Sequence, residues 1–95
     1  MITSTANPQI KNLVLLGKKT RARKEQGLFL AEGIKMVGEA PEHWIQKLYV
    51  SETYLIEHSS DDRFFRMDYE AVSDSVMKTI SGTQTPQGIL AAVSI

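Results

Sequence analysis

Short apolar runs alternate with helical patterns along most of this sequence, and this alternation restricts the possible folds more than any other feature. Runs that are apolar on both faces, or rich in β-branched and aromatic residues, are typical of strands. They occur at residues 28–31, 44–50, 69–72 and 89–95. Because helical patterns separate these runs, we expect an α/β sandwich with a largely parallel sheet. Ninety-five residues allow one such domain.

Capping residues and helix breakers predict where the helices begin and end. Asn7-Pro8 predicts the start of the first helix, because asparagine accepts hydrogen bonds from free N–H groups and proline suits the first helical position. We expect Gly17 to bend this helix into a basic segment and Gly27 to end it. The other predicted helices cover residues 33–40, 52–58 and 74–80, the last two with the caps Ser51 and Ser73.

Residues 63–72 fit two patterns. Their first residues are aromatic and fit the beginning of a strand, whereas a helical stripe would join Tyr69, Val72, Val76 and Ile80. We predict a strand over 69–72 and a helix over 74–80, and the choice between strand and helix for 63–72 stays open from the sequence alone. The polar composition of residues 59–62 and 81–88 predicts loops.

A basic cluster near the N-terminus is the strongest candidate for a binding site. Five cations lie within seven residues: Lys18, Lys19, Arg21, Arg23 and Lys24. Residues 1–35 hold seven Lys/Arg against two acids, whereas residues 36–95 hold four against nine, so only the first part suits a polyanion such as nucleic acid. Five cations so close together cannot share one helical face, so we expect this segment to stand in solvent or against a charged partner. A solvated surface helix is the alternative interpretation.

No catalytic or metal-binding motif is recognisable in the sequence. The chain has no cysteine and no phosphate-binding glycine loop, and His43 and His58 are isolated. We therefore expect a binding module rather than a complete enzyme, with no catalytic residue and no metal site. The apolar runs are too short to cross a bilayer and no signal pattern begins the chain, so we expect a cytoplasmic protein without membrane contact.

Several short motifs give the sequence a resemblance to a known family. In order they are Asn7-Pro8 with Ile10-Lys11, the Lys18/Lys19/Arg21 group, Phe29-Leu30 with Glu32-Gly33, and Thr85-Pro86-Gln87-Gly88. Together they resemble the N-terminal substrate-binding domain of SpoU/TrmH-family RNA ribose 2′-O-methyltransferases. The resemblance implies a three-layer α/β/α sandwich like that of kink-turn-binding ribosomal proteins, with an N-terminal helical basic segment.

The same resemblance implies that residues 1–95 form one RNA substrate-binding domain of a larger enzyme. RNA, ribosomal or transfer, is the implied partner. Catalysis would belong to a domain after residue 95 that binds S-adenosylmethionine and forms a homodimer, so no cofactor is expected in residues 1–95. The chain ends directly after its last predicted strand, as expected of a sequence cut at a domain boundary.

The RNA contacts are assigned here from charge, because the resemblance does not specify them. We predict contacts from Lys11, Lys18, Lys19, Arg21, Arg23 and Lys24, which neutralise phosphates. The loop over 81–88 is a second possible contact, through Thr83, Thr85 and Gln87, and a plain connecting loop is the alternative. Whether residues 18–26 are ordered without RNA stays open.

Other interpretations remain for Glu32 and for the domain as a whole. Glu32 fits a functional carboxylate, but a negative group beside a helix N-terminus is stabilising in itself, and we favour that structural role. Instead of binding RNA for an enzyme, the domain fits a protein-interaction or dimerisation module that uses strand edges with Phe64 and Phe65. A free-standing RNA-binding protein of the kink-turn type is the third hypothesis.

Overall fold

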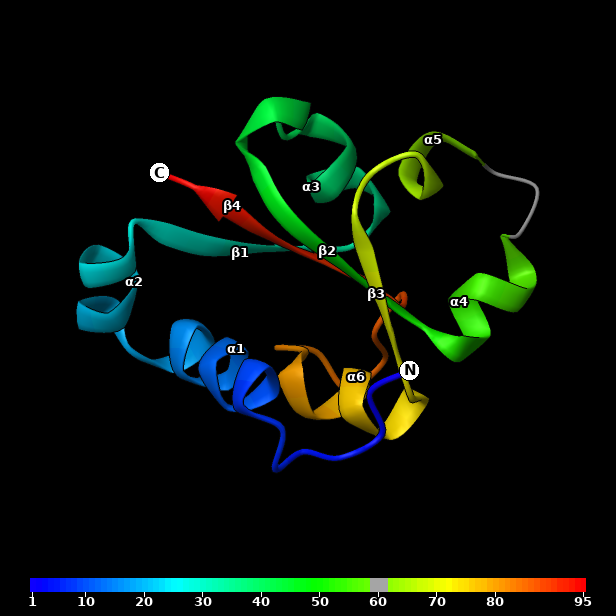
Figure 1. Ribbon diagram of the computed structural model, residues 1–95, viewed down its shortest axis with the longest axis horizontal. Coiled ribbons are helices and arrows are strands. Elements are labelled where there is room, and N and C mark those ends of the chain that lie inside the picture. The colour runs from blue at the N-terminus through cyan, green and yellow to red at the C-terminus, as the bar shows by residue number, and fades with distance from the viewer. Residues whose placement is uncertain (59–61) are drawn as a thin grey trace.

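The computed structural model describes residues 1–58 and 62–95, which form one sheet with helices on both faces (Figure 1). In chain order the elements are α1 (Pro8–Lys18), α2 (Thr20–Gln26), β1 (Leu28–Glu32), α3 (Ile34–Glu39), the 3-10 helix η1 (Glu42–Trp44), β2 (Ile45–Ser51), α4 (Glu52–Glu57), α5 (Asp62–Phe65), β3 (Tyr69–Val72), α6 (Asp74–Ile80) and β4 (Ile89–Ser94). Helices α1 and α6 cover one face of the sheet, and α3 covers the other. The predicted three-layer α/β/α sandwich is confirmed.

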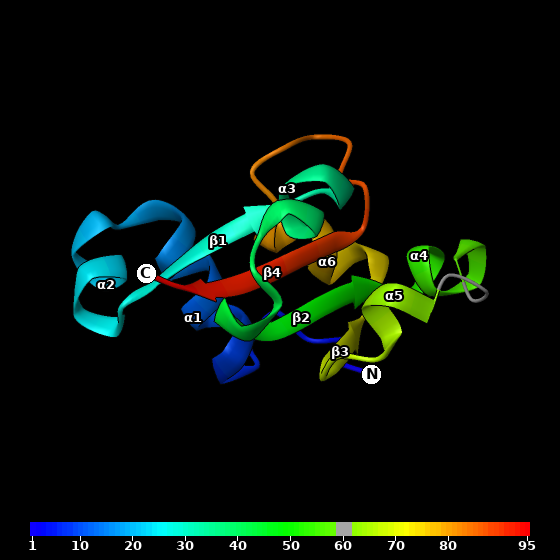
Figure 2. The same cartoon turned by 90° about the horizontal axis from the view of Figure 1, so that it is seen from above.

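The strand order is β1-β4-β2-β3, and Figure 2 shows β4 lying between β1 and β2. Strand β4 is antiparallel to both of these neighbours, whereas β2 and β3 pair in parallel. The prediction of a largely parallel sheet is therefore wrong. Helix α6 is seven residues long, roughly 10 Å, and the loop after it returns the chain to the end of β2, where Ser51 N donates to Gly88 O at 2.8 Å. Strand β4 therefore starts at the end of the sheet where β2 finishes, and it runs in the opposite direction to β2.

Strand β4 is apolar on both faces because helices cover both faces of the sheet. Ile89, Ala91 and Val93 of β4 pack in the core on the α3 side, whereas Leu90 packs with α1 and α6. Successive side chains of a strand point to opposite faces, so β4 reads as a continuous apolar run. Strand β1 also contributes side chains to both core layers, but it lies at the edge of the sheet and is mostly half-buried.

Local hydrogen bonds explain most of the helix boundaries. Asn7 Oδ1 accepts from Gln9 N at 2.8 Å, Ser51 Oγ from Tyr54 N at 3.0 Å and Ser73 Oγ from Val76 N at 3.2 Å, so all the predicted side-chain caps are confirmed. Gly27 ends α2 with a positive φ of 65°, as predicted. The predicted bend at Gly17 is wrong. Helix α1 continues through Gly17 to Lys18, and the chain turns at Lys19, whose φ of −117° and ψ of 113° are extended.

The strand over 69–72 and the helix over 74–80 are confirmed at the predicted residues. Before them, Asp62–Phe65 forms the short helix α5, which the sequence pattern did not predict. Phe64 is only 3% exposed, and Phe65 packs against the core on the α3 side. These two phenylalanines therefore stabilise the fold and do not form the partner surface that the protein-interaction hypothesis requires. The loop predicted at 59–62 lies outside the described residues for 59–61.

Candidate nucleic-acid interface

The basic cluster is divided between two helices. Lys18 is the last residue of α1, Lys19 joins the helices, and Arg21, Arg23 and Lys24 belong to α2. Helix α2 lies at one end of the sheet, beside the start of β1 (Figure 1). The only buried residue of α2 is Ala22, which joins the core beneath α1. Helix α2 is held to α1 by Ala22 in the core, by hydrogen bonds between Gln26 and Asn12 and by the contacts of Arg23 described below, while most of the charges of the cluster face solvent.

The five cations have different partners. Arg21 Nε lies 2.9 Å from Glu25 Oε1, and both side chains are largely exposed, so this ion pair adds little stability. Lys18, Lys19 and Lys24 are exposed, and the described part of the chain offers them no acidic group within ion-pair distance. Lys11 is also exposed, further back along α1. These four lysines are therefore available to an external anion.

Arg23 has a structural role within the cluster. Its Nη1 donates to the carbonyl oxygen of Leu16 at 2.7 Å, and its Nη2 donates to Thr20 Oγ1 at 3.0 Å. The last carbonyl groups of a helix have no partner inside the helix, so Arg23 satisfies one of them at the end of α1. The half-buried guanidinium thus fixes the angle between α1 and α2. The sequence marked Arg23 as an RNA contact, and this second role depends on a turn at Lys19 that it did not predict.

Arg23→Lys is expected to lower the free energy of unfolding by about 1 kcal/mol, because one ammonium group cannot reproduce both hydrogen bonds of the guanidinium. Urea denaturation measures this loss. The substitution keeps the positive charge, so the dependence of RNA binding on salt should stay that of the unmodified chain. A stability equal to that of the unmodified chain would contradict the structural role of Arg23.

The loop after α6 is tied to β1 and α3 by side chains that the sequence singled out. The carboxylate of Glu32 accepts hydrogen bonds from Ser81 Oγ and from Gly82 N, the latter at 2.9 Å. Gln87 Oε1 accepts from Ile34 N at 2.6 Å, at the start of α3. Glu32 therefore has a structural role, although it holds the loop and not the helix N-terminus. Gln87, predicted as a possible RNA contact, also serves the fold.

The threonines of this loop are the part that remains open to solvent. Thr83 and Thr85 are both exposed. Their backbone N–H groups donate to Ser81 Oγ at 3.1 Å and to Thr83 Oγ1 at 2.9 Å, which gives the loop a defined turn. No hydrogen bond or ion pair among the described residues joins Thr83 or Thr85 to a lysine or arginine. The groove described below is lined by Lys18 and Arg23 of the basic cluster and by Glu32.

Two glycines allow the motifs of β1 and of the loop to meet. Gly33 and Gly88 have φ values of 93° and 94°, which residues other than glycine rarely adopt. A Cβ atom at Gly33 would lie 2.9 Å from Gln87 Oε1, and one at Gly88 would lie 2.5 Å from Ser51 Oγ. The Glu32-Gly33 and Pro86-Gln87-Gly88 motifs are therefore explained by contacts within the fold.

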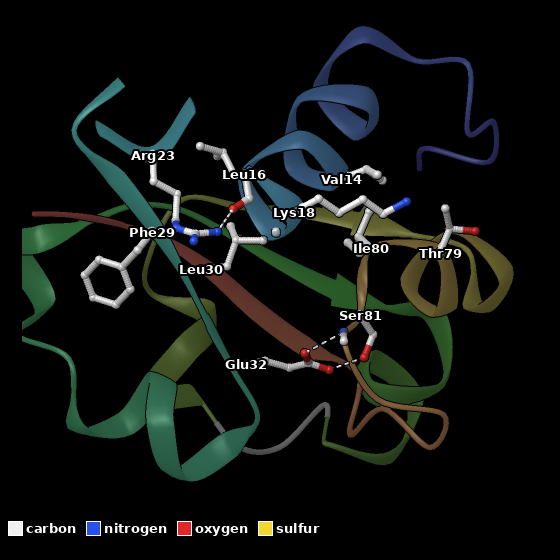
Figure 3. Close-up of a pocket in the computed structure, with 12 residues that line it drawn as sticks. Val14, Leu16, Lys18, Arg23, Phe29, Leu30, Glu32, Thr79, Ile80 and Ser81 are labelled. Atoms are coloured by element: carbon white, nitrogen blue, oxygen red, sulfur yellow. Dashed lines mark hydrogen bonds between the residues drawn. The ribbon is translucent and has the colours of Figure 1, made fainter. Parts of the chain in front are cut away.

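A groove of about 400 Å³ lies next to the basic cluster (Figure 3). The end of α1, strand β1 and the end of α6 form its walls. The residues that matter for its chemistry are Val14, Gly17, Lys18, Arg23, Leu30, Glu32 and Ile80. Sequence reasoning missed this groove, which lies along the face of α1 that carries Val14 and Gly17. Val14 is half-buried and Gly17 is exposed, so that face is incompletely covered.

A second polar contact joins the starts of α4 and α6. Asp74 Oδ2 accepts from Thr53 Oγ1 at 2.6 Å, and Asp74 Oδ1 accepts from Thr53 N at 3.1 Å. The hydrogen bonds from the side chain and then the backbone of Thr53 hold the pKa of Asp74 below its ordinary value.

Within residues 1–58 and 62–95, no group of acidic or histidine side chains is placed to hold a metal ion. In the same ranges, no helix has the length and apolar character needed to span a membrane.

Residues 7–91 match the family described as the MRM3-like substrate binding domain. The chain belongs to this family. The match leaves out only six residues at one end and four at the other, so the family covers every element from α1 into β4. A comparison of the sequence with curated proteins found no match.

Several solved structures similar to this MRM3-like domain are methyltransferases by their descriptions. An RNA 2′-O ribose methyltransferase is 31% identical with a TM-score of 0.79, over 98% of this chain and 36% of that one. An rRNA methyltransferase from Sinorhizobium meliloti is 27% identical with a TM-score of 0.74, over 99% and 36%. The AdoMet-bound SpoU methyltransferase AviRb from Streptomyces viridochromogenes is 19% identical with a TM-score of 0.71, over 94% and 33%, and shows the shared fold alone.

These findings confirm the resemblance predicted from the sequence, to the substrate-binding domain of SpoU/TrmH-type RNA methyltransferases. The MRM3-like domain spans about a third of the length of the methyltransferases that it matches.

Proposed function

We propose that this MRM3-like domain binds the RNA substrate of an S-adenosylmethionine-dependent RNA ribose 2′-O-methyltransferase. The names of its structural relatives, an RNA 2′-O ribose methyltransferase and an rRNA methyltransferase, support an RNA substrate, with ribosomal RNA ahead of transfer RNA. Because the chain spans about a third of these relatives, we place the methyl-transfer chemistry in a domain after residue 95. We also propose that the enzyme is cytoplasmic and that it dimerises through that catalytic domain.

The RNA is held mainly by electrostatic attraction in this proposal. Its phosphates contact the exposed cations Lys11, Lys18, Lys19, Arg21 and Lys24, while Arg23 fixes the geometry and contributes its charge. Cations that neutralise phosphates release condensed counterions, which gives affinity with little sequence information. The observation that carries the proposal is the set of exposed lysines that have no acidic partner among the described residues, on a domain of a substrate-binding family. Thr83 and Thr85 are the hydroxyl groups that an RNA lying along the loop would meet.

We place the binding of S-adenosylmethionine outside this domain and assign no step of methyl transfer to its residues. The space in front of Gly33 and Gly88 is occupied by Gln87 and Ser51 of the chain itself, which supports this placement. In the proposal the cofactor therefore binds to the catalytic domain, and the MRM3-like domain supplies position and affinity.

The logarithm of the RNA association constant is expected to fall with the logarithm of salt concentration at a slope of about −3. This value corresponds to about four of the exposed cations contacting phosphates of single-stranded RNA at the same time. Fluorescence anisotropy with fragments of ribosomal and transfer RNA, titrated at several salt concentrations, measures the slope. Absence of any association in dilute buffer, or a slope near zero, would refute the proposed function.

A further inference from the structure

The groove beside the basic cluster has an apolar floor. Val14 and Leu30 are half-buried and Ile80 is almost fully buried, and all three line the groove. Its volume of about 400 Å³ falls in the range of small-molecule sites. Phosphate groups can be bound by positive charge alone and do not require an apolar surface. The apolar hollow next to the lysines therefore suits a flat, weakly polar part of the ligand.

The two sides of the groove have opposite charge. Figure 3 shows Lys18 and Arg23 on the α1 side, Glu32 with Ser81 on the opposite side, and Leu30 between them. Hydrogen bonds to Leu16 and Thr20 fix the guanidinium of Arg23, and hydrogen bonds from Ser81 and Gly82 fix the carboxylate of Glu32. The groove is therefore preorganised, and its polarity can orient a ligand.

We propose that this groove holds one unstacked nucleotide of the RNA substrate. The base lies on Leu30 and Ile80 against the guanidinium plane of Arg23, and the phosphate is held by Lys18. Proteins that recognise RNA commonly take unpaired bases out of the stack and place them on aromatic rings or on arginine planes. This inference rests on the proposed function and specifies which part of the RNA the domain recognises.

The carboxylate of Glu32 favours a base that carries an amino group. Each of its oxygens accepts one hydrogen bond within the chain, and a carboxylate has about four lone-pair sites, so it retains acceptor capacity. It attracts the amino groups of adenine, cytosine and guanine and repels a phosphate. The backbone of the RNA must therefore pass on the side of Lys18, and uracil should be the poorest occupant.

Gly17 offers a way to fill the groove without changing any charge. A Cβ atom at Gly17 would lie 3.7 Å from Leu30 Cδ1, which is an ordinary contact, so a side chain there is directed at the floor of the groove. Gly17→Phe places a ring in the hollow, and Gly17→Ala is the matched control, with a smaller side chain that also favours the helix. Thermal unfolding of both variants verifies that they fold.

The measurement is the affinity for an RNA hairpin with one unpaired cytidine in its loop. Gly17→Phe is expected to weaken binding about tenfold, the effect of losing one stacked base, whereas Gly17→Ala should stay within about twofold of the unmodified chain. Uridine in place of the cytidine should weaken binding of the unmodified chain about fivefold. The salt slope of Gly17→Phe should differ from that of the other two proteins by at most the one phosphate contact of Lys18, about 0.7, because the cations are unchanged.

An abasic site in the same hairpin tests the proposal without any variant. The unmodified chain should lose about tenfold in affinity, and Gly17→Phe should lose nothing further on this RNA. If Gly17→Phe binds the cytidine hairpin as tightly as Gly17→Ala does, or if the abasic RNA binds as well as the cytidine RNA, the groove does not hold a nucleotide; a peptide segment as its occupant would give this result. If the unmodified chain binds no RNA, the proposed function itself fails.

Discussion

Replacing Lys19 and Lys24 together by glutamate is expected to lower the RNA affinity of this domain about a hundredfold in dilute buffer. Both lysines are exposed and have no acidic partner among the described residues, so each is free to contact a phosphate. The change removes two phosphate contacts and adds two repulsive charges. Anisotropy titrations at one fixed low salt concentration measure the loss, and the salt slope should become shallower by about 1.4.

A matched control distinguishes the effect of the basic cluster on RNA affinity from the effect of the net charge of the domain. Lys35→Glu with Arg66→Glu changes the net charge equally, at two exposed residues outside the cluster. This control pair should lower the affinity less than about fivefold, through the general field of the protein. Equal losses for the two pairs would mean that RNA responds to the overall charge of the domain, and the assignment of the interface to α1 and α2 would be wrong.

Gly88→Ala is expected to lower the free energy of unfolding by about 3 to 5 kcal/mol, from strain in the left-handed region together with overpacking. The new Cβ atom would lie 2.5 Å from Ser51 Oγ and 3.0 Å from Tyr54 Cβ, and both of these side chains are buried. Neither neighbour can move freely, because Ser51 caps α4 and Tyr54 lies in the core. Urea denaturation followed by circular dichroism measures the loss.

Gly27→Ala is the control for this prediction. Gly27 also has a positive φ, of 65°, but a Cβ atom there would meet nothing within 4 Å. Its cost should therefore be the backbone strain alone, about 1 kcal/mol. If the two substitutions destabilise the domain equally, the crowding at Gly88 contributes nothing and the packing of the loop against β2 is looser than the structure indicates.

The features that the sequence predicted correctly depend on local chemistry. Asn7, Ser51 and Ser73 cap helices through hydrogen bonds to N–H groups two or three residues later, so a short window of sequence contains the whole interaction. Gly27 ends α2 for a similarly local reason, its left-handed backbone. The strand over 69–72 was also found, because a serine cap directly after it separates it from α6.

The features that the sequence did not predict depend on which segments meet in space. The direction of β4 follows from the end of the sheet to which the loop over 81–88 returns the chain. No property of residues 89–94 themselves decides this direction. The turn at Lys19 is supported by Arg23, which reaches back to Leu16. The basic cluster was visible as a composition, but the separate role of Arg23 within it was not.

The candidate site divides in the same way. Exposed lysines could be selected from sequence because charge and exposure go together. Gln87 could not be assigned, because its acceptor role depends on Ile34, which is far away along the chain. The groove was not predictable either, because its walls come from α1, β1 and α6 and no single segment contains it.

The position of β4 has a consequence for how the domain is made. Strands β1 and β2 are translated before β4, and each pairs with β4 in the finished sheet, so neither can complete its hydrogen bonds until β4 inserts between them. Before that insertion β2 can pair with β3, but both core layers lack the side chains that β4 supplies, Leu90 on one face and Ile89, Ala91 and Val93 on the other. Completion of the sheet is therefore a late and cooperative event, governed by the closure of contacts between distant parts of the chain.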